Sequence, residues 1–113
     1  MALDRAQKEQ LRRLLLDKLR KACKESKKFG YNPSYFIEML QDRDADEVAE
    51  LVILKDPPPT GFSRLLLNKR LDLSTEHIIL TGEWKELFDF PVLEKARERL
   101  DECGHSYTEW YPD

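Results

Sequence analysis

Residues 3–28, LDRAQKEQLRRLLLDKLRKACKESKK, decide the fold class of this 113-residue chain. The stretch contains no Pro or Gly and is rich in Leu, Ala, Lys, Arg and Gln, which are all good helix formers. Its apolar residues recur at spacings of three and four, as on a helix with one buried face. They are Leu11, Leu15, Leu19, Ala22 and Cys23, with Leu14 and Leu16 at the edges of the stripe. Gly30 is placed to end the helix, so the pattern predicts a basic amphipathic helix over 1–28.

The chain beyond residue 30 is typical of a series of short helices. Their predicted starts carry residues that cap helix N-termini, in two cases together with a proline that suits the first turn. These cap residues are Asn32, Asp44, Thr60, Ser74 and Asp89. The run Leu51–Leu54 fits a buried strand by composition, but no neighbouring segment could pair with it, so we expect a helix there. Pro57–Pro59 then form an extended connector, which is either a loop, the preferred interpretation, or a polyproline ligand for a partner.

These elements predict an all-α fold. A chain of this length fits one domain, and no alternating polarity indicates a β-hairpin. We expect a compact single-domain bundle of six or seven mostly short helices over residues 1–104, and an aromatic tail over 105–113. Tyr107, Trp110 and Tyr111 favour a tail that docks onto the domain over one that forms an adhesive free edge.

The charge is distributed unevenly along the chain. The formal net charge is −3, but residues 1–28 carry +6 and residues 29–113 carry −9. The longest apolar run has four residues, far fewer than the ~20 needed to span a bilayer. The first residues lack the apolar stretch of a signal peptide. We therefore expect a cytoplasmic protein without a membrane partner.

Few residues suggest chemistry. Cys23 and Cys103 fall on apolar helix faces, which favours small buried hydrophobes over metal ligands. His77 and His105 stand near helix ends, outside any triad or metal pattern. Asp72 lies in a tight turn and is expected to bind nearby backbone N–H groups. We expect no catalytic, cofactor-binding or metal site and predict that the protein is not an enzyme; the alternative is an effector enzyme using Asp72, Glu76 and His77.

The basic first helix and the tail are the candidate contact surfaces for a macromolecule. Four lysines at spacings of three and four could form one ridge beside the apolar stripe, able to contact phosphates or an acidic protein. A solvated helix face is the plain alternative. The candidate binding residues are Arg12, Arg13, Lys18, Arg20, Lys21, Lys24, Lys28, Tyr107, Trp110 and Tyr111.

Residues 60–80 offer a second route to nucleic acid. The predicted pair of short helices, Thr60–Lys69 and Ser74–Leu80, has the outline of a helix-turn-helix. The second helix carries no Arg, Asn or Gln to contact base edges. A structural helical corner is therefore the preferred interpretation of this pair.

Several motifs occur in a characteristic order along the chain. They are GYNPSYFIEML over 30–40, GFSRL over 61–65, RLDLSTE over 70–76, IL at 79–80, LF at 87–88 and ARERL over 96–100. In this layout the chain resembles a family of small, uncharacterised bacterial helical proteins. The resemblance implies an all-helical fold and a setting near phage-defence or restriction systems, and it brings no catalytic residue or cofactor. This chain departs from the family pattern at Arg43–Asp46, where the family has a Gly-Gly turn, at Leu51–Leu54, and in its aromatic tail.

The sequence as a whole predicts a non-enzymatic binding or accessory protein that contacts another macromolecule, with a protein as the expected partner. Nucleic-acid binding, through the basic first helix or through the pair at 60–80, is the alternative.

Overall fold

The chain folds into six α-helices and two short 3-10 helices in a computed structural model that describes residues 2–112. Met1 and Asp113, the outer ends of the predicted domain and tail, lie outside the described residues. The elements are α1 (Arg5–Lys28), α2 (Ser34–Asp42), α3 (Ala45–Leu54), α4 (Thr60–Leu67), η1 (Leu71–Leu73), α5 (Thr75–Thr81), η2 (Glu83–Leu87) and α6 (Phe90–Glu102). The prediction of an all-α fold with a long first helix is confirmed.

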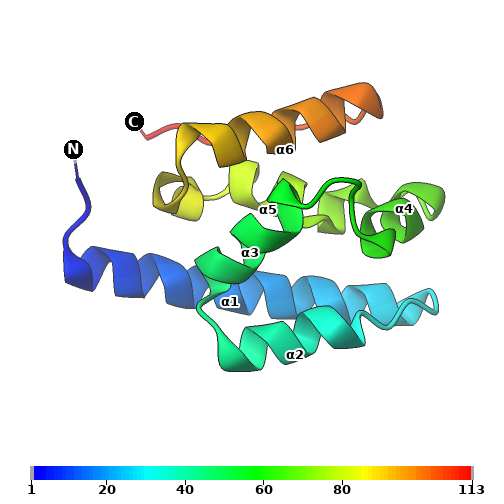
Figure 1. Cartoon of the computed structure of the whole chain (residues 1–113), viewed down its shortest axis with the longest axis horizontal. Helices are drawn as coiled ribbons and strands as arrows, with labels where there is room; N and C mark the ends of the chain where they lie inside the picture. Colours follow the sequence, from blue (N-terminus) through cyan, green and yellow to red (C-terminus); the bar gives the residue numbers. More distant parts are fainter. Residues whose placement is uncertain (1, 113) are drawn as a thin grey trace.

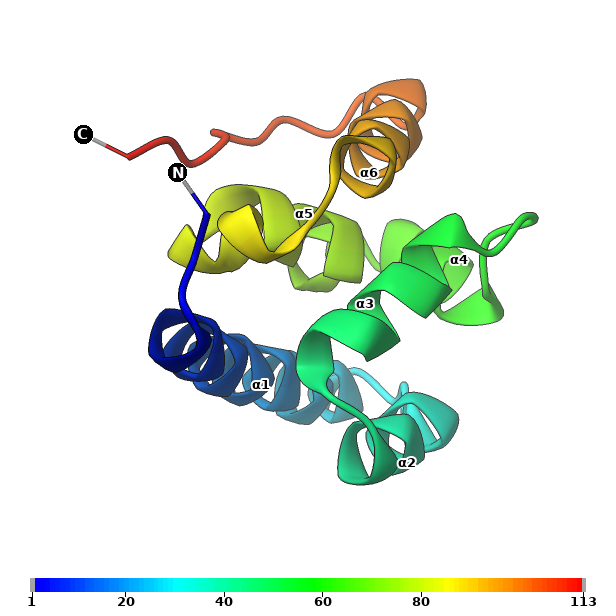
Figure 2. The ribbon, with the colours of Figure 1, turned by 60° about the vertical axis from the view of Figure 1, so that its left-hand side comes forward.

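The short helix α5 lies at the centre of the molecule. It is sandwiched between α1 and α6, while α3 crosses beside all three (Figure 1, Figure 2). Ile78, Ile79 and Leu80 of α5 are fully buried. α2 packs on the outside against α1 and α3, and α4 joins η1 at the far end of α1. None of the helices in the described part of the chain is long and apolar enough to span a bilayer.

The apolar stripe of α1 packs where the spacing predicts. Leu15, Leu19, Ala22 and Cys23 are buried. The helix begins with a capping box that the sequence analysis did not include: the Gln7 N–H donates to Asp4 Oδ1 at 2.8 Å, and the Asp4 N–H donates to Gln7 Oε1 at 2.9 Å. The helix ends at the predicted place, before Gly30, whose φ of +89° favours glycine.

The predicted caps are only partly correct. Ser74 caps α5 as expected, since its Oγ accepts the His77 N–H at 3.1 Å. Asp44 and Asp89 occupy the cap positions of α3 and α6, but neither side chain makes a capping hydrogen bond. The side-chain caps predicted at Asp44 and Asp89 are therefore wrong.

The other two predicted caps are displaced by one residue because of neighbouring prolines. Pro33 and Pro59 themselves occupy the cap positions of α2 and α4, so Asn32 lies outside its helix and Thr60 is the first helical residue. The ring of proline fixes φ and removes the N–H. Each helix therefore starts after its proline without a side-chain cap.

The run Leu51–Leu54 is helical, as predicted. It forms the C-terminal half of α3, in which Ile53 is fully buried. Leu51 and Leu54 point outward and are 49% and 46% exposed. The helix therefore buries one face and presents two leucines to solvent.

The tail docks onto the domain, which confirms the preferred interpretation. The Trp110 N–H donates to the carbonyl of Leu80, near the end of α5, at 2.8 Å. The tail returns along α6 and α5 toward the end of the molecule where α1 begins (Figure 2). There Trp110 and Leu3 line the same open hollow of about 440 Å³. Residues 105–112 therefore pack as part of the same body as the helices.

Candidate functional site

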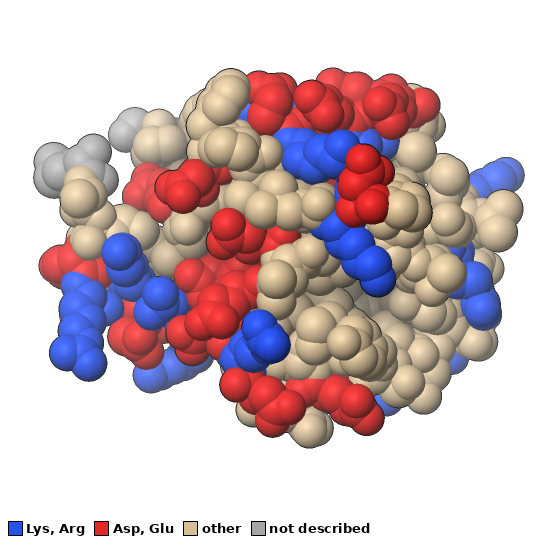
Figure 3. All heavy atoms as spheres, viewed as in Figure 1, with Lys and Arg blue, Asp and Glu red and all other residues tan. Residues whose placement is uncertain are grey.

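The basic ridge of α1 is present in the structure and exposed. Its four lysines, Lys18, Lys21, Lys24 and Lys28, are exposed, as are the neighbouring Arg13 and Arg20. Within residues 2–112, only Lys28 of these six forms an ion pair, with Glu25 at 2.8 Å. Asp17 is also exposed on α1, between these cations in sequence. The surface is therefore positive but interrupted by carboxylates, and Figure 3 shows basic and acidic side chains interspersed over the N-terminal half of α1.

Arg12 does not belong to this free surface. Its Nε donates to Asp46 Oδ1 at 3.1 Å, and its Nη1 lies 3.1 Å from Glu9 Oε1. The Arg12 side chain is 29% exposed and that of Asp46 is 16% exposed. Hydrogen bonding to Asp46 raises the pKa of Arg12. Arg12 therefore links α1 to α3.

The aromatic residues of the tail mainly contact the protein itself. Tyr107 is half-buried; its ring stacks on His105, and its hydroxyl lies 3.4 Å from Asp101 Oδ1. Trp110 is half-buried beside the first turns of α1. Tyr111 is 66% exposed, with Lys85 Nζ 3.7 Å from its ring centroid. Of the three predicted contact residues, only Tyr111 presents most of its ring to solvent.

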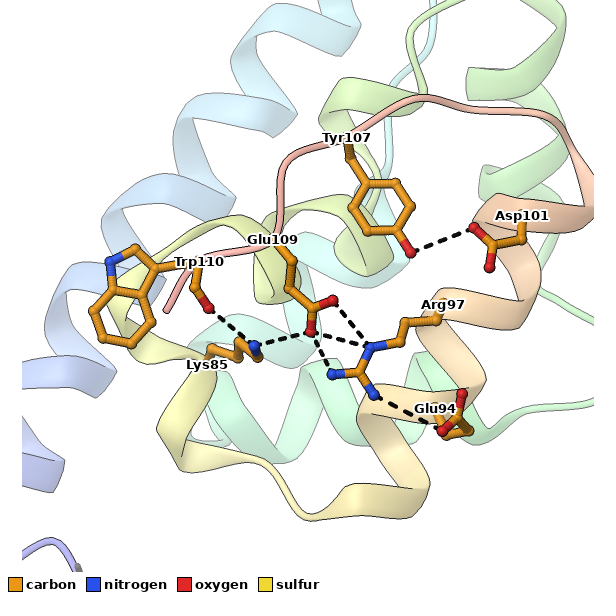
Figure 4. Close-up of polar contacts among 7 residues, drawn as sticks. All are labelled: Lys85, Glu94, Arg97, Asp101, Tyr107, Glu109 and Trp110. Atoms are coloured by element: carbon orange, nitrogen blue, oxygen red, sulfur yellow. Dashed lines mark hydrogen bonds and ion pairs between the residues drawn. The ribbon is translucent and has the colours of Figure 1, made fainter. Parts of the chain in front are cut away.

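A carboxylate that the sequence analysis did not single out anchors the tail. Glu109 accepts from Arg97 Nε at 3.0 and 3.2 Å, accepts from a terminal nitrogen of the same guanidinium, and lies 2.9 Å from Lys85 Nζ (Figure 4). Lys85 also donates to the Trp110 carbonyl at 2.9 Å. Hydrogen bonding to Arg97 lowers the pKa of Glu109. This network, with partners 12 and 24 positions away, holds the tail against η2 and α6.

A second network lies in the core, where Arg99 of α6 meets Glu76 of α5. Arg99 Nη1 donates to Glu76 Oε2 at 2.9 Å, and the two side chains are 4% and 5% exposed. The same guanidinium donates to the carbonyls of Val52, at 3.2 Å, and Lys55. Burial raises the pKa of Glu76, although Arg99 acts in the opposite direction. Arg99 thus joins the C-terminal end of α3 to α5 and α6.

The two histidines form a pair. His77 Nδ1 lies 2.9 Å from His105 Nε2, with the rings edge-on and their centroids 5.1 Å apart. Burial lowers the pKa of His77, and the nearby His105 and Lys18 act in the same direction, while Asp72 opposes them. Both histidines stand near helix ends, as predicted, but their pairing was not predicted, because it requires the docked tail to bring His105 onto α5.

The three residues of the alternative enzyme interpretation do not form a cluster. The carboxylate of Asp72 accepts from Arg70 at 3.0 and 3.2 Å, so its main partner is a guanidinium and not the predicted backbone N–H groups. Glu76 is buried against Arg99, and His77 faces His105. Each residue is engaged by a different partner.

The cysteines lie in different environments. Cys23 is buried as predicted, and burial raises the pKa of its thiol to about 11. Cys103 is half-buried at the C-terminal cap of α6, so the predicted burial is complete only for Cys23. Both are free thiols. Within residues 2–112, no group of three or more potential ligands is placed to hold a metal ion.

A surface on α2 and α3 is the feature that sequence reasoning missed. Residues 34–54 carry six acidic side chains and one basic one, a net charge of −5. Five of these carboxylates are exposed and form no ion pair with any residue in 2–112, and two exposed leucines stand among them. We call these residues the α2–α3 surface: Glu38, Asp42, Asp44, Glu47, Glu50, Leu51 and Leu54.

The α2–α3 surface contains an open hollow along the outer side of α3. Its volume is about 430 Å³, and it is lined by Arg43, Glu47, Glu50, Leu51, Leu54 and Lys55. Figure 3 shows an uncharged area on this face, with acidic side chains below it over α2 and with Lys and Arg side chains between it and the acidic side chains over α6. Helical spacing alone could have indicated this surface, because it places Leu51 and Leu54 on a different face of α3 from the buried Val48 and Ala49.

Comparison of the chain with protein-family models, with curated proteins and with solved structures gave no match. The resemblance to a bacterial helical family therefore stays a prediction, and the function must be argued from the surfaces themselves.

Proposed function

We propose that this protein is a non-enzymatic accessory protein that binds another protein. The observation that supports this proposal is the pair of exposed leucines, Leu51 and Leu54, on the α2–α3 surface. They are set among five carboxylates that form no ion pair within residues 2–112. Burial of exposed apolar area is the main favourable term in protein association. Fully burying an exposed leucine contributes about 1.5–3 kcal/mol, so each of these half-exposed leucines can contribute about half of that. A contiguous apolar area bordered by polar residues marks an interaction site on a monomer.

The proposal also includes a cellular location and a biological context for the protein. Two free thiols suit the reducing cytoplasm. The resemblance stated above adds bacterial phage defence or restriction as the setting in which the partner acts. The tail, one of the two contact surfaces expected from the sequence, is omitted from the proposal because Glu109, Trp110 and Tyr107 are engaged within the protein.

Photo-crosslinking in the cell that makes the protein tests this proposal. A photoreactive amino acid replaces Leu54 in one variant and Leu67 in a matched control, because Leu67 is an equally apolar residue on α4 that is 79% exposed. We expect a discrete protein adduct from position 54 that is absent from position 67. If position 54 gives no protein adduct, or the same adducts as position 67, the proposal is wrong.

The exposed cations of α1 favour nucleic-acid binding as the second candidate function. Arg13, Arg20 and Lys24 are exposed and form no ion pair within residues 2–112, so they are available to phosphates. The helix pair at 60–80 adds no support, because α5 is enclosed by α1, α3 and α6 and presents no free face to a groove. The test is the affinity for a generic DNA duplex at low and high salt. Absent binding at low salt, or binding without a salt slope, would exclude this function.

A further inference from the structure

We infer that the α2–α3 surface binds a basic amphipathic helix of a partner protein, with the apolar side chains of that helix seated on Leu51 and Leu54. This inference rests on the proposed function and specifies the chemistry of the partner. It is carried by three features of the surface: its apolar centre, the sign of its charge, and its shape.

The apolar centre is formed by side chains that the fold leaves uncovered. α3 buries Val48, Ala49 and Ile53 against the core. Leu51 and Leu54 lie on another face of the same helix and are about half exposed. Because they are three positions apart, they lie one above the other on the helix surface. They therefore offer two adjacent apolar contacts, which suits a partner with apolar residues at helical spacing.

The charge of the surface selects a basic partner. Exposed Glu47 and Glu50 line the hollow, and Glu38, Asp42 and Asp44 lie on or beside α2. Arg43 and Lys55 are the cations that line the hollow; in sequence they flank α3. A helix with Lys or Arg beside its apolar stripe would therefore meet the carboxylates of α2 and α3.

The shape of the surface fits a helix rather than a small molecule. The hollow is open, holds about 430 Å³, and is lined by α3 and the two residues that flank it. α3 has ten residues, which corresponds to a length of about 15 Å. A helix of about three turns laid along α3 would cover this length and place one residue in each turn near Leu51, Leu54 or a flanking carboxylate.

A titration of the isotope-labelled full chain with a designed peptide tests the inference. The probe is a helical peptide of about 14 residues, built from Leu at positions i, i+3, i+4 and i+7 and Lys elsewhere. Two peptides of the same length serve as controls: one in which Glu replaces Lys, and one with the Leu and Lys positions scrambled. We expect the probe to shift the amide signals of residues 47–55, and both controls to bind at least tenfold more weakly.

Paired substitutions locate the contact. L51D/L54D removes the apolar centre, and E47K/E50K reverses the charge; each should weaken binding of the probe about tenfold or more, as expected for residues at the centre of an interface. L67D on α4 and E83K on η2 are the matched controls and should change the affinity less than twofold. L51Q/L54Q repeats the apolar test without added charge, and the far-ultraviolet circular dichroism of every variant should match that of the parent chain.

Several results would overturn the inference. These are equal binding of the scrambled peptide, binding of the Glu peptide, and signal shifts that avoid α3. Sedimentation that shows a dimer of the parent chain, lost in L51Q/L54Q, would mean that a second copy covers the surface. A crosslinked partner whose contact segment lacks Lys and Arg would refute this inference while leaving the proposed function in place.

Discussion

Replacing Arg99 by Met removes the guanidinium that lies between α3, α5 and α6. Three acceptors lose a donor: the carboxylate of Glu76 and the backbone carbonyls of Val52 and Lys55. Because the Glu76 side chain is 5% exposed, water cannot replace the lost partner. Breaking a buried ion pair costs about 3–5 kcal/mol, and we expect a loss of about 4 kcal/mol from a domain whose total stability is in the range of 5–15 kcal/mol.

The loss should depend on pH, and its sign follows from Glu76. Burial raises the pKa of this carboxyl, while Arg99 lowers it. A carboxyl whose pKa is raised in the folded state stabilises the fold below its unfolded pKa, and that contribution is lost as the pH rises through the folded value. Without Arg99 the folded pKa rises further. The stability that R99M loses relative to the parent chain should therefore be smaller at pH 5 than at pH 8.

Urea unfolding at 25 °C, followed by far-ultraviolet circular dichroism at pH 5 and pH 8, measures both effects. R70M is the matched control, because Arg70 pairs with Asp72 at the surface and the same substitution there should change little. The double variant E76M/R99M removes the buried charge and should recover part of the loss but not all, since the two carbonyls stay without a donor.

Two results would refute this reasoning. One is a loss in R99M no larger than in R70M. The other is a double variant as unstable as R99M at both pH values, which would show that the buried carboxylate contributes nothing to the loss.

Three further perturbations test other parts of the structure. Burial, His105 and Lys18 lower the pKa of His77, so the unfolded chain binds more protons than the folded chain. The free energy of unfolding should therefore fall as the pH drops below about 6.5. H77Q should reduce this pH dependence in denaturation at pH 5 and 7, and an unchanged pH dependence would contradict the role given to His77. E109Q weakens the contacts of Glu109 with Lys85 and Arg97. Hydrogen exchange at the Trp110 amide should therefore accelerate about tenfold, which corresponds to roughly 1.4 kcal/mol. The control T108A, a change at an exposed neighbour, should leave the exchange rate unaltered. G82A places a Cβ against the ring of Trp84, and overpacking of this kind should cost about 1–3 kcal/mol and alter the tryptophan fluorescence. An unchanged urea midpoint would contradict this prediction.

Local patterns predicted the helices well because helix signals are local. The stripe from Leu15 to Cys23 gave the buried face of α1, and Ser74 gave the start of α5. The caps at Asn32 and Thr60 were misplaced because a neighbouring proline shifted the helix boundary by one residue. Each of these results depends on a few adjacent residues.

The contacts that define the core and the surfaces could not be predicted, because they join residues that lie far apart in the sequence. Glu76 had the appearance of an ordinary acidic residue in a first helical turn, and only the central position of α5 shows that it is buried against Arg99, 23 positions away. The pairing of His77 with His105 and of Lys85 with Glu109 requires knowledge of where the tail docks. The helix over Leu51–Leu54 was predicted, but not that Leu51 and Leu54 lie on a face that stays uncovered.

The bond from the Trp110 N–H to the Leu80 carbonyl has a consequence for biosynthesis. The central helix obtains this donor from a residue translated thirty positions after its acceptor. At about 5–20 residues per second, a nascent chain waits roughly 1.5–6 s between the synthesis of α5 and the arrival of the tail. During that interval the chain cannot form this bond, so the central helix completes its hydrogen bonding only after residue 110 has been added.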